Sequence, residues 1–251
     1  MKVLVDIGNT RLKYCQVTDN FTTLTMSDIE AIHVSSLNVV WLDQHWKQAK
    51  KIIIGSVNQP ALLAKIITWA EQNNIATQIV TSEQQAYGVI SGYLTPERLG
   101  VDRWLAIVGA WQLYPDKNLI IVDAGTATTV DVLSAHGQHL GGWILPGIDC
   151  MHQSVLKNTA QVEGNLKQAN LAFANNTEDN VNNACWAATI GLIKVAIEQI
   201  NKLNLTLDDI ILTGGNTMPL SKLLDVPHQC HEELIFYGLQ SYSKSAIYVE
   251  K

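Results

Sequence analysis

Two segments of this chain place an aspartate and a glycine directly after a short apolar run. Asp6 to Thr10 follows Lys2 to Val5, and a related segment, Asp123 to Thr129, follows Asn118 to Val122. Another strand-like run comes after each copy. One copy alone would be interpreted as a β-turn rich in Asp, Gly and Asn. Two copies, each between two strands, instead predict a duplicated nucleotide-binding fold.

The residue types in these turns are suited to a metal–phosphate group. Aspartate supplies the hard oxygen that a cation such as Mg²⁺ prefers. Glycine lets the backbone approach phosphates closely, and Asn and Thr side chains donate hydrogen bonds to phosphate oxygens. We therefore expect the two turns to close on a metal–phosphate group from opposite sides.

The size of the chain is compatible with two halves. It has 251 residues, of which 47% are hydrophobic and 16% are charged, as is ordinary for a globular protein with a substantial core. No low-complexity linker separates the two copies, so we expect a close junction near Pro115 to Asn118. The predicted halves are residues 1–115, with the first phosphate turn and the acceptor segment, and 116–251, with the second turn and the adenosine side.

Charge and hydropathy exclude several classes of protein. With 17 Lys and Arg against 23 Asp and Glu, the net charge of −6 argues against a general binder of nucleic acid or acidic membranes. Asp6 interrupts the N-terminus before a secretory apolar core can form, and no later apolar run reaches the length of a membrane span. These patterns predict a cytoplasmic protein.

The cysteines suggest neither disulfides nor a zinc ribbon, because the four of them lie far apart with no CxxC pair. We expect reduced thiols. The run from His228 to His231 does contain three potential metal ligands, His228, Cys230 and His231. A second ligand cluster is missing from the sequence, so a surface loop is the favoured interpretation.

Strand and helix patterns alternate in both halves, which predicts an α/β fold with mixed sheets. In the first half, strands are expected at 2–8, 11–17, 51–57 and 77–80, and a helix at 60–73. In the second half, strands are expected at 119–122, 127–133, 139–144 and 209–213, and the clearest helix at 183–203.

Two patterns in the second half leave alternatives open. The helix at 183–203 carries an apolar stripe that indicates core or subunit interface, formed by Trp186, Ile190, Ile193, Ile197 and Ile200. The strand at 209–213 ends at Gly214, Gly215 and Asn216, where the glycines either admit a flat nucleoside or mark a tight turn.

A second candidate for chemistry is the run from Gly100 to Trp104, which precedes an apolar, helix-compatible stretch. Asp102 is suited to accept a proton from an attacking hydroxyl, and Arg103 to hold an anionic substrate through paired hydrogen bonds. The alternative is a helix-start Asp beside a structural Arg. The glycines of Gly141 to Gly147 similarly indicate either a bend beside a cleft or strand-end packing.

The commonest phosphate and hydrolase motifs, GxxxxGK[ST], GxGxxG and GxSxG, are absent from the sequence. Taken together, however, the motifs that are present resemble type III pantothenate kinases, of the acetate and sugar kinase, Hsp70 and actin superfamily. The resemblance runs nearly end to end. It is carried in order by Asp6 to Lys13, Tyr93 through Arg103, Asp123 to Asp131, Gly141 to Gly147, and Thr213 to Gly215.

The resemblance implies an α/β fold of duplicated ribonuclease H-like (actin-like ATPase) domains with mixed five-stranded sheets and flanking helices. It implies ATP-dependent phosphorylation of the primary hydroxyl of pantothenate, giving 4'-phosphopantothenate in the first step of coenzyme A biosynthesis. A homodimer with the substrate close to the subunit contact is also implied.

The resemblance further implies roles for individual residues. Asp102 would be the general base, and the pantothenate contacts would be Tyr93, Gly100, Val101, Asp102, Arg103 and Thr177. The ATP contacts would be Asp6, Ile7, Gly8, Asn9, Thr10, Arg11, Leu12, Lys13 and Thr126. Mg²⁺ would accompany the phosphates, held by Asp6 directly or through water, and Asp123 would bind a monovalent cation, K⁺ or NH₄⁺.

The sequence departs from the family pattern at Thr159 to Gly164, where many relatives carry a Leu-Pro pair, so the path of this loop is open. Two other functions also stay open. One is a different small-molecule kinase or phosphatase on the same scaffold, since a fold does not fix the substrate. The other is a non-catalytic regulatory protein that retains the nucleotide cleft, although the set of Asp6, Asp102, Arg103 and Asp123 favours an enzyme.

Overall fold

A computed structural model describes residues 1–18, 24–57, 59–159 and 164–244. The chain forms two compact units: Met1–Leu113 together with the chain from Glu233 onward, and Tyr114–Glu232. The predicted halves 1–115 and 116–251 differ from these units at the C-terminal side, because helix α7 (Leu234–Ser243) folds with the N-terminal unit. Burial explains this, since α7 packs on a helix and two strands of that unit.

The first unit contains a mixed five-stranded sheet in the order β3-β2-β1-β4-β5. The central strand β1 pairs antiparallel with β2 and parallel with β4. The strands are β1 (Lys2–Ile7), β2 (Arg11–Val17), β3 (Glu30–His33), β4 (Lys51–Ser56) and β5 (Ala76–Ile79). The predicted strands of this half are therefore confirmed, while the edge strand β3 was not predicted.

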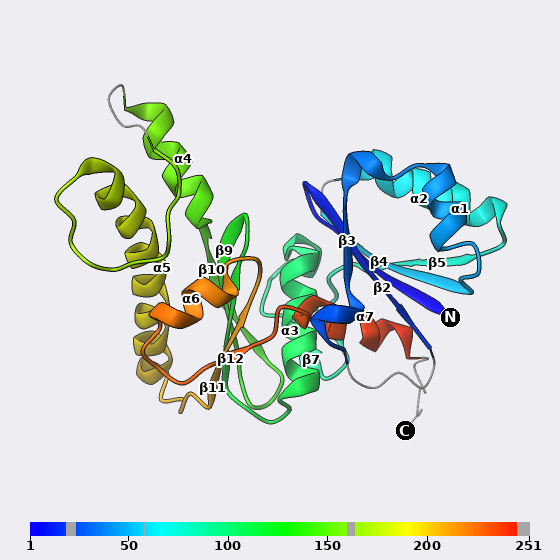
Figure 1. Cartoon of the computed structure of the whole chain (residues 1–251). Helices are drawn as coiled ribbons and strands as arrows, with labels where there is room; N and C mark the ends of the chain where they lie inside the picture. The colour runs from blue at the N-terminus through cyan, green and yellow to red at the C-terminus, as the bar shows by residue number, and fades with distance from the viewer. Residues whose placement is uncertain (19–23, 58, 160–163, 245–251) are drawn as a thin grey trace. The chain divides into compact units, whose positions relative to one another are not determined.

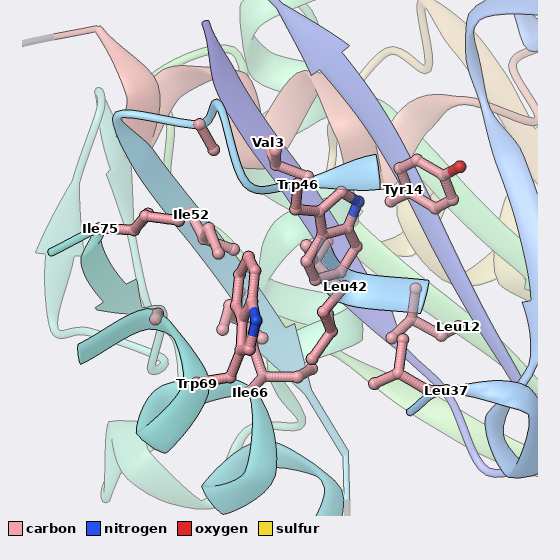
Figure 2. Close-up of a cluster of buried hydrophobic side chains, with 14 of the residues drawn as sticks. Val3, Leu12, Tyr14, Leu37, Leu42, Trp46, Ile52, Ile66, Trp69 and Ile75 are labelled. Atoms are coloured by element: carbon pink, nitrogen blue, oxygen red, sulfur yellow. The ribbon is translucent and has the colours of Figure 1, made fainter. Parts of the chain in front are cut away.

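Alternation along β1 divides its side chains between two faces of the sheet. Val3, Val5 and Ile7 share a core with α1 (Val39–His45) and α2 (Pro60–Gln72), where Figure 2 shows Trp46 and Trp69 lying among aliphatic side chains. Figure 1 shows both helices beside this sheet. Asp6 has the opposite parity, so it points to the other face of the sheet.

That other face is covered by α3 (Val101–Leu113) and α7. Gly55 of β4 is the register partner of Asp6, and a Cβ atom built on it would lie 2.7 Å from a methyl carbon of Leu105 in α3. The segment between β5 and α3 contains a small hairpin, β6 (Gln85–Ala86) and β7 (Val89–Ile90). The sheet thus places Asp6 on the face that α3 covers.

The second unit repeats the topology of the first. Its sheet has the order β10-β9-β8-β11-β12, with β8 antiparallel to β9 and parallel to β11. The strands are β8 (Leu119–Ala124), β9 (Ala127–Leu133), β10 (His139–Pro146), β11 (Asp209–Thr213) and β12 (Gln229–Cys230). The predicted fold class, a duplicated α/β architecture with mixed five-stranded sheets, is confirmed.

Helices α4 (Ile148–Asn158), α5 (Thr177–Lys202) and α6 (Thr217–Leu223) accompany this sheet, as Figure 1 shows. The predicted apolar stripe of α5 packs in the core of this unit, against β8 residues such as Ile120 and Val122. The helix starts earlier than predicted because Asn176 caps it, its Oδ1 accepting a hydrogen bond of 2.9 Å from the N–H of Asp179.

Candidate active site

The first phosphate turn joins β1 to β2. The N–H of Gly8 donates to the carbonyl of Arg11 at 3.0 Å and closes the turn, whose tip residues Asn9, Thr10 and Arg11 are exposed. The predicted contact residues Ile7 and Leu12 are fully buried, so neither is exposed to a ligand in this structure. The exposed polar tip suits the phosphates of a nucleotide.

Asp6 and Lys13 are opposite each other in the register of β1 and β2, so their side chains share one face. Burial raises the pKa of Asp6 to about 6; the Lys13 ammonium opposes this effect, and the Asp102 carboxylate adds to it. Asp6 therefore lies near both a cation and a second carboxylate within the first unit. An additional positive charge at this place would stabilise the ionised form of Asp6.

Asp102 lies in the first turn of α3 and is partly exposed. Its Oδ1 accepts a hydrogen bond of 2.8 Å from the N–H of Arg103, and the N–H of Trp104 donates to the carbonyl of Gly100 at 2.9 Å. The second carboxylate oxygen has no partner among the interactions described for this turn. An oriented, accessible carboxylate of this kind can accept a proton from a bound hydroxyl.

Arg103 is buried, with 5% of its surface exposed, and it is fixed against Tyr93. Its Nη1 donates to the Tyr93 hydroxyl at 2.7 Å, and its guanidinium carbon lies 5.6 Å from the centroid of the Tyr93 ring. A guanidinium held in one orientation binds an anionic group with little further ordering. The structure thus brings together five of the predicted site residues in one unit: Asp6, Lys13, Tyr93, Asp102 and Arg103.

The second phosphate turn joins β8 to β9 and is tighter. The N–H of Gly125 donates to the carbonyl of Ala127 at 3.0 Å, and the N–H of Gly147 donates to the carbonyl of Thr126 at 3.0 Å. A Cβ atom on Gly147 would lie 2.3 Å from the carbonyl oxygen of Gly125, so this position requires glycine. The Thr126 side chain stays exposed, as contact with a phosphate requires.

Asp123 sits beside the glycine that follows β11. Gly214 has φ +90°, and a Cβ atom there would lie 2.3 Å from Oδ1 of Asp123. The side chain of Asp123 is partly exposed, and its Oδ1 occupies the place that a side chain at position 214 would take. A carboxylate among backbone groups provides the oxygen ligands that a hard cation prefers.

Thr177 begins α5 and is exposed. It lines a groove of about 430 Å³ between α4 and α5, whose other walls are largely apolar: Met151, Val155, Asn180, Val181, Ala184 and Cys185. Thr177 belongs to the second unit, whereas Tyr93 and Asp102 belong to the first. Its predicted contact with the same substrate therefore stays a prediction.

The side chains of the run from His228 to His231 do not converge on a common site. His228 contacts Ser221 Oγ at 2.7 Å through Nε2, whereas His231 contacts the Tyr114 hydroxyl at 2.7 Å. Part of the run forms β12, so the favoured surface-loop interpretation is wrong in this respect. Across the described ranges, no three His, Cys, Asp or Glu residues are grouped to hold a metal.

This result is compatible with the predicted Mg²⁺ role of Asp6, since Mg²⁺ at a nucleotide usually takes one or two carboxylates and completes its shell with water and phosphates. In the described part of the chain, no helix is long and apolar enough to span a bilayer. In the divergent loop from Thr159 to Gly164, residues 160–163 lie outside the described residues.

Two supporting contacts were not predicted. The Gln59 side-chain amide, just before α2, donates to the carbonyl of Asn9 at 3.0 Å, and the N–H of Asn216 donates to the carbonyl of Ala124 at 2.9 Å. Both residues fix the backbone of a phosphate turn from a distant point in the sequence. No sequence motif marks Gln59, and Asn216 stands out in the sequence only as part of a glycine-rich strand end. The role of each residue depends on the parallel strand that it follows.

Comparison with known proteins identifies the family. The family model described as type III pantothenate kinase matches residues 2–199. A type III pantothenate kinase from Colwellia psychrerythraea is 42% identical, covering 97% of this chain and 100% of the relative. Another from Pseudoalteromonas translucida is 37% identical, covering 86% of this chain and 85% of the relative.

Solved structures support the fold. A Campylobacter jejuni protein assigned to the Baf family of transcriptional activators is 23% identical, with a TM-score of 0.62 and coverage of 96% of this chain and 97% of that one. A Sinorhizobium meliloti protein assigned as a 2-dehydro-3-deoxygalactonokinase is 13% identical, with a TM-score of 0.61 over both full chains. By its sequence, this chain belongs to the type III pantothenate kinase family.

Proposed function

We propose that this chain is an ATP-dependent pantothenate kinase, which transfers the γ-phosphoryl group of ATP to the primary hydroxyl of pantothenate and forms 4'-phosphopantothenate for coenzyme A biosynthesis. The observation that carries this proposal is the cluster in the first unit. There, the accessible carboxylate of Asp102 and the Arg103–Tyr93 pair accompany the Asp6–Lys13 phosphate turn.

Asp102 acts as the general base. Its Oδ1 is held by the N–H of Arg103, which orients the carboxylate toward a hydroxyl bound at the start of α3. Pantothenate carries a carboxylate, and the guanidinium of Arg103 with the hydroxyl of Tyr93 binds that end, while Gly100 and Val101 provide backbone contacts. Alignment of the acceptor with the phosphate supplies most of the rate, because phosphoryl transfer has a loose transition state.

The ATP contacts are residues 6–13 and Thr126. Lys13 offsets charge on the phosphate oxygens, and Asp6 holds Mg²⁺, directly or through water. When bound, Mg²⁺ neutralises charge on the phosphates and so assists transfer. Burial raises the pKa of Asp6 although the Lys13 ammonium opposes this effect, and a cation beside the carboxylate would favour its ionised form.

Asp123 would hold a monovalent cation, K⁺ or NH₄⁺, through its partly exposed carboxylate. We further propose a homodimer in the cytoplasm, where ATP is available. In such a dimer the exposed Thr177 at the start of α5 contributes to pantothenate binding.

A coupled assay for ADP formation, with and without pantothenate, tests the function. We expect ADP to form only when pantothenate is present, with 4'-phosphopantothenate identified by mass spectrometry. Equal ADP formation with glycerol, glucose or no acceptor would contradict the substrate. Nucleotide binding without turnover on any acceptor would instead support a regulatory protein.

A further inference from the structure

A side-chain network connects the C-terminal helix to both ends of the segment that carries the acceptor residues. We define the acceptor segment as residues 82–103. The indole Nε1 of Trp104 donates to the Tyr242 hydroxyl at 2.7 Å, and that hydroxyl donates to Oε1 of Glu83 at 2.7 Å. Tyr242 lies on α7, Glu83 lies near the start of the acceptor segment, and Trp104 directly follows its end.

Tyr242 is well placed to hold these two ends together. Its side chain is nearly buried, with 6% exposure, and Trp104 is fully buried. Its ring also packs edge-on against the ring of Tyr87, with centroids 4.6 Å apart. Burial raises the pKa of Tyr242, so its hydroxyl remains a proton donor toward Glu83 throughout the usual assay range.

The hairpin within the acceptor segment needs this support. Tyr87 is at its turn and has φ +52°, a left-handed conformation that is unfavourable for a residue with a side chain. Contacts with α7 and α3 offset this cost: the Tyr242 ring packs on Tyr87, and Gln112 of α3 donates to the carbonyl of Tyr87 at 3.1 Å. The hairpin is therefore held from outside the segment.

The position of the segment matters because the two substrate residues lie at different points along it. Tyr93 is in its middle and Arg103 is at its end, and the hydrogen bond between them requires both to be in place. The buried Ser82 hydroxyl donates to the carbonyl of Leu99 at 2.8 Å and provides another closure. A displacement of about 1 Å at a reacting group can cost about 100-fold in rate.

We propose that Tyr242 is a positioning residue for the acceptor site: its hydroxyl ties Glu83 to Trp104 and thereby fixes the distance between Tyr93 and Arg103. This inference rests on the proposed assignment of Tyr93 and Arg103 to pantothenate. It gives α7 a role in substrate binding, although the helix carries none of the predicted site residues.

The chain offers a matched control on the same helix. The Tyr237 hydroxyl donates to the carbonyl of Leu24 at 3.0 Å and accepts from the N–H of Leu24 at 3.2 Å. Tyr237→Phe and Tyr242→Phe each remove one hydroxyl and two hydrogen bonds from α7. Only Tyr242 is tied to the acceptor segment, so a general loss of stability affects both variants and a loss of positioning affects one.

The experiment measures kcat, KM for each substrate and the thermal midpoint of both variants, with pantothenate binding followed by calorimetry. We expect Tyr242→Phe to raise KM and Kd for pantothenate about tenfold, because the variant loses two hydrogen bonds that hold the acceptor segment. KM for ATP should stay within about twofold of its value in the unmodified enzyme. Tyr237→Phe should leave both KM values within about twofold, even where the thermal midpoint falls.

Glu83 provides a milder second test because its side chain is exposed. Glu83→Gln keeps an oxygen that accepts from Tyr242 and should behave like the unmodified enzyme, whereas Glu83→Ala should raise KM for pantothenate about threefold. An unchanged pantothenate KM and Kd in Tyr242→Phe, or an equal rise in Tyr237→Phe, would overturn the positioning role. Pantothenate binding without turnover in the unmodified protein would overturn the kinase assignment alone, and no pantothenate binding would overturn both.

Discussion

The two phosphate turns have the same place in their sheets but use different means to prepare for a ligand. At the first turn the preparation is electrostatic: Asp6 is opposite Lys13, and the Asp102 carboxylate contributes to its raised pKa. At the second turn it is steric, since Asp123 Oδ1 lies where a Cβ atom of any residue other than glycine at position 214 would be. Duplication has kept the topology while the chemistry of the two copies has diverged.

The two copies should therefore tolerate different substitutions. At the first turn the charge of Asp6 interacts with those of Lys13 and Asp102, so substitutions there should change the pKa of Asp6 and the affinity for ligands. The backbone of the second turn is in close contact with neighbouring atoms, so an added methyl group there should displace those atoms. The following predictions test this division, starting from the largest expected effect.

Asp102→Asn should lower kcat by about 10²- to 10⁴-fold, the usual contribution of a general base. The fold should persist, because the Asn Oδ1 can still accept from the N–H of Arg103. Steady-state kinetics and circular dichroism check both parts. Asp149→Asn is the matched control in the second unit, since Asp149 also lies in the first turn of a helix and is exposed. Comparable losses in the two variants would remove the special role of Asp102.

Gly214→Ala should lower the free energy of unfolding by about 2–4 kcal/mol. The new Cβ would meet Asp123 Oδ1 at 2.3 Å, and the left-handed φ of +90° adds a conformational cost. Gly215→Ala is the control, because a Cβ there has no neighbour within 4 Å. Urea unfolding of both variants provides the measurement. Equal stability of the two would show that the second turn adapts as readily as the first.

Exchange of K⁺ or NH₄⁺ for Na⁺ at constant ionic strength should lower the activity about tenfold, and Asp123→Asn should abolish the difference between the ions. The expected cause is a fixed spacing of oxygen ligands around Asp123, which suits one cation radius. Initial rates in each salt check this effect. If the unmodified enzyme has the same rate in all three salts, the carboxylate is structural and the proposed ion site is withdrawn.

The pH dependence of the first turn should be the smallest effect. Asp6 has a folded pKa of about 6 against an ordinary 3.8, so its ionisation is disfavoured by folding. Without ligand, stability should therefore fall as pH rises from about 4 to about 6. Nucleotide binding with Mg²⁺ needs the ionised form, so it should weaken as pH falls through about 6.

Asp102→Asn removes the neighbouring carboxylate and should shift the Asp6 midpoint to lower pH, whereas Lys13→Met removes the opposing ammonium and should shift it to higher pH. Carbon NMR of the Asp6 carboxyl group in the ligand-free protein measures both shifts. A midpoint near pH 4 in the unmodified protein would show that the first turn is not electrostatically prepared.

Much of the architecture could be predicted from local patterns. The limits of β2 and β9 were predicted residue by residue, because a turn on one side and alternating apolar residues define them. Strand β3 was missed because Glu30–His33 is a largely exposed edge strand without an apolar face. The start of α5 was missed because its first turn is polar and depends on the Asn176 cap.

The sequence motifs predict the identities of the site residues, but they do not predict the environments that the structure gives these residues. Asp6 and Asp102 are separated by most of the first unit in sequence, and their mutual effect arises only when α3 covers one face of the sheet. Likewise, the close packing of Asp123 Oδ1 depends on Gly214, which follows a parallel strand. Such properties are set by long-range packing, on which the sequence motifs give no information.

The return of α7 to the first unit has a consequence for the order in which the protein can be completed during synthesis. Domains generally fold as units as the chain emerges. Residues 114–232 form the whole second unit, so its sheet can be complete while the first unit still lacks α7. Only when Leu234 to Ser243 has been made can the helix cover β1 and β4. A ribosome-bound chain that stops before Leu234 would thus contain a finished Asp123 turn and an unfinished acceptor site.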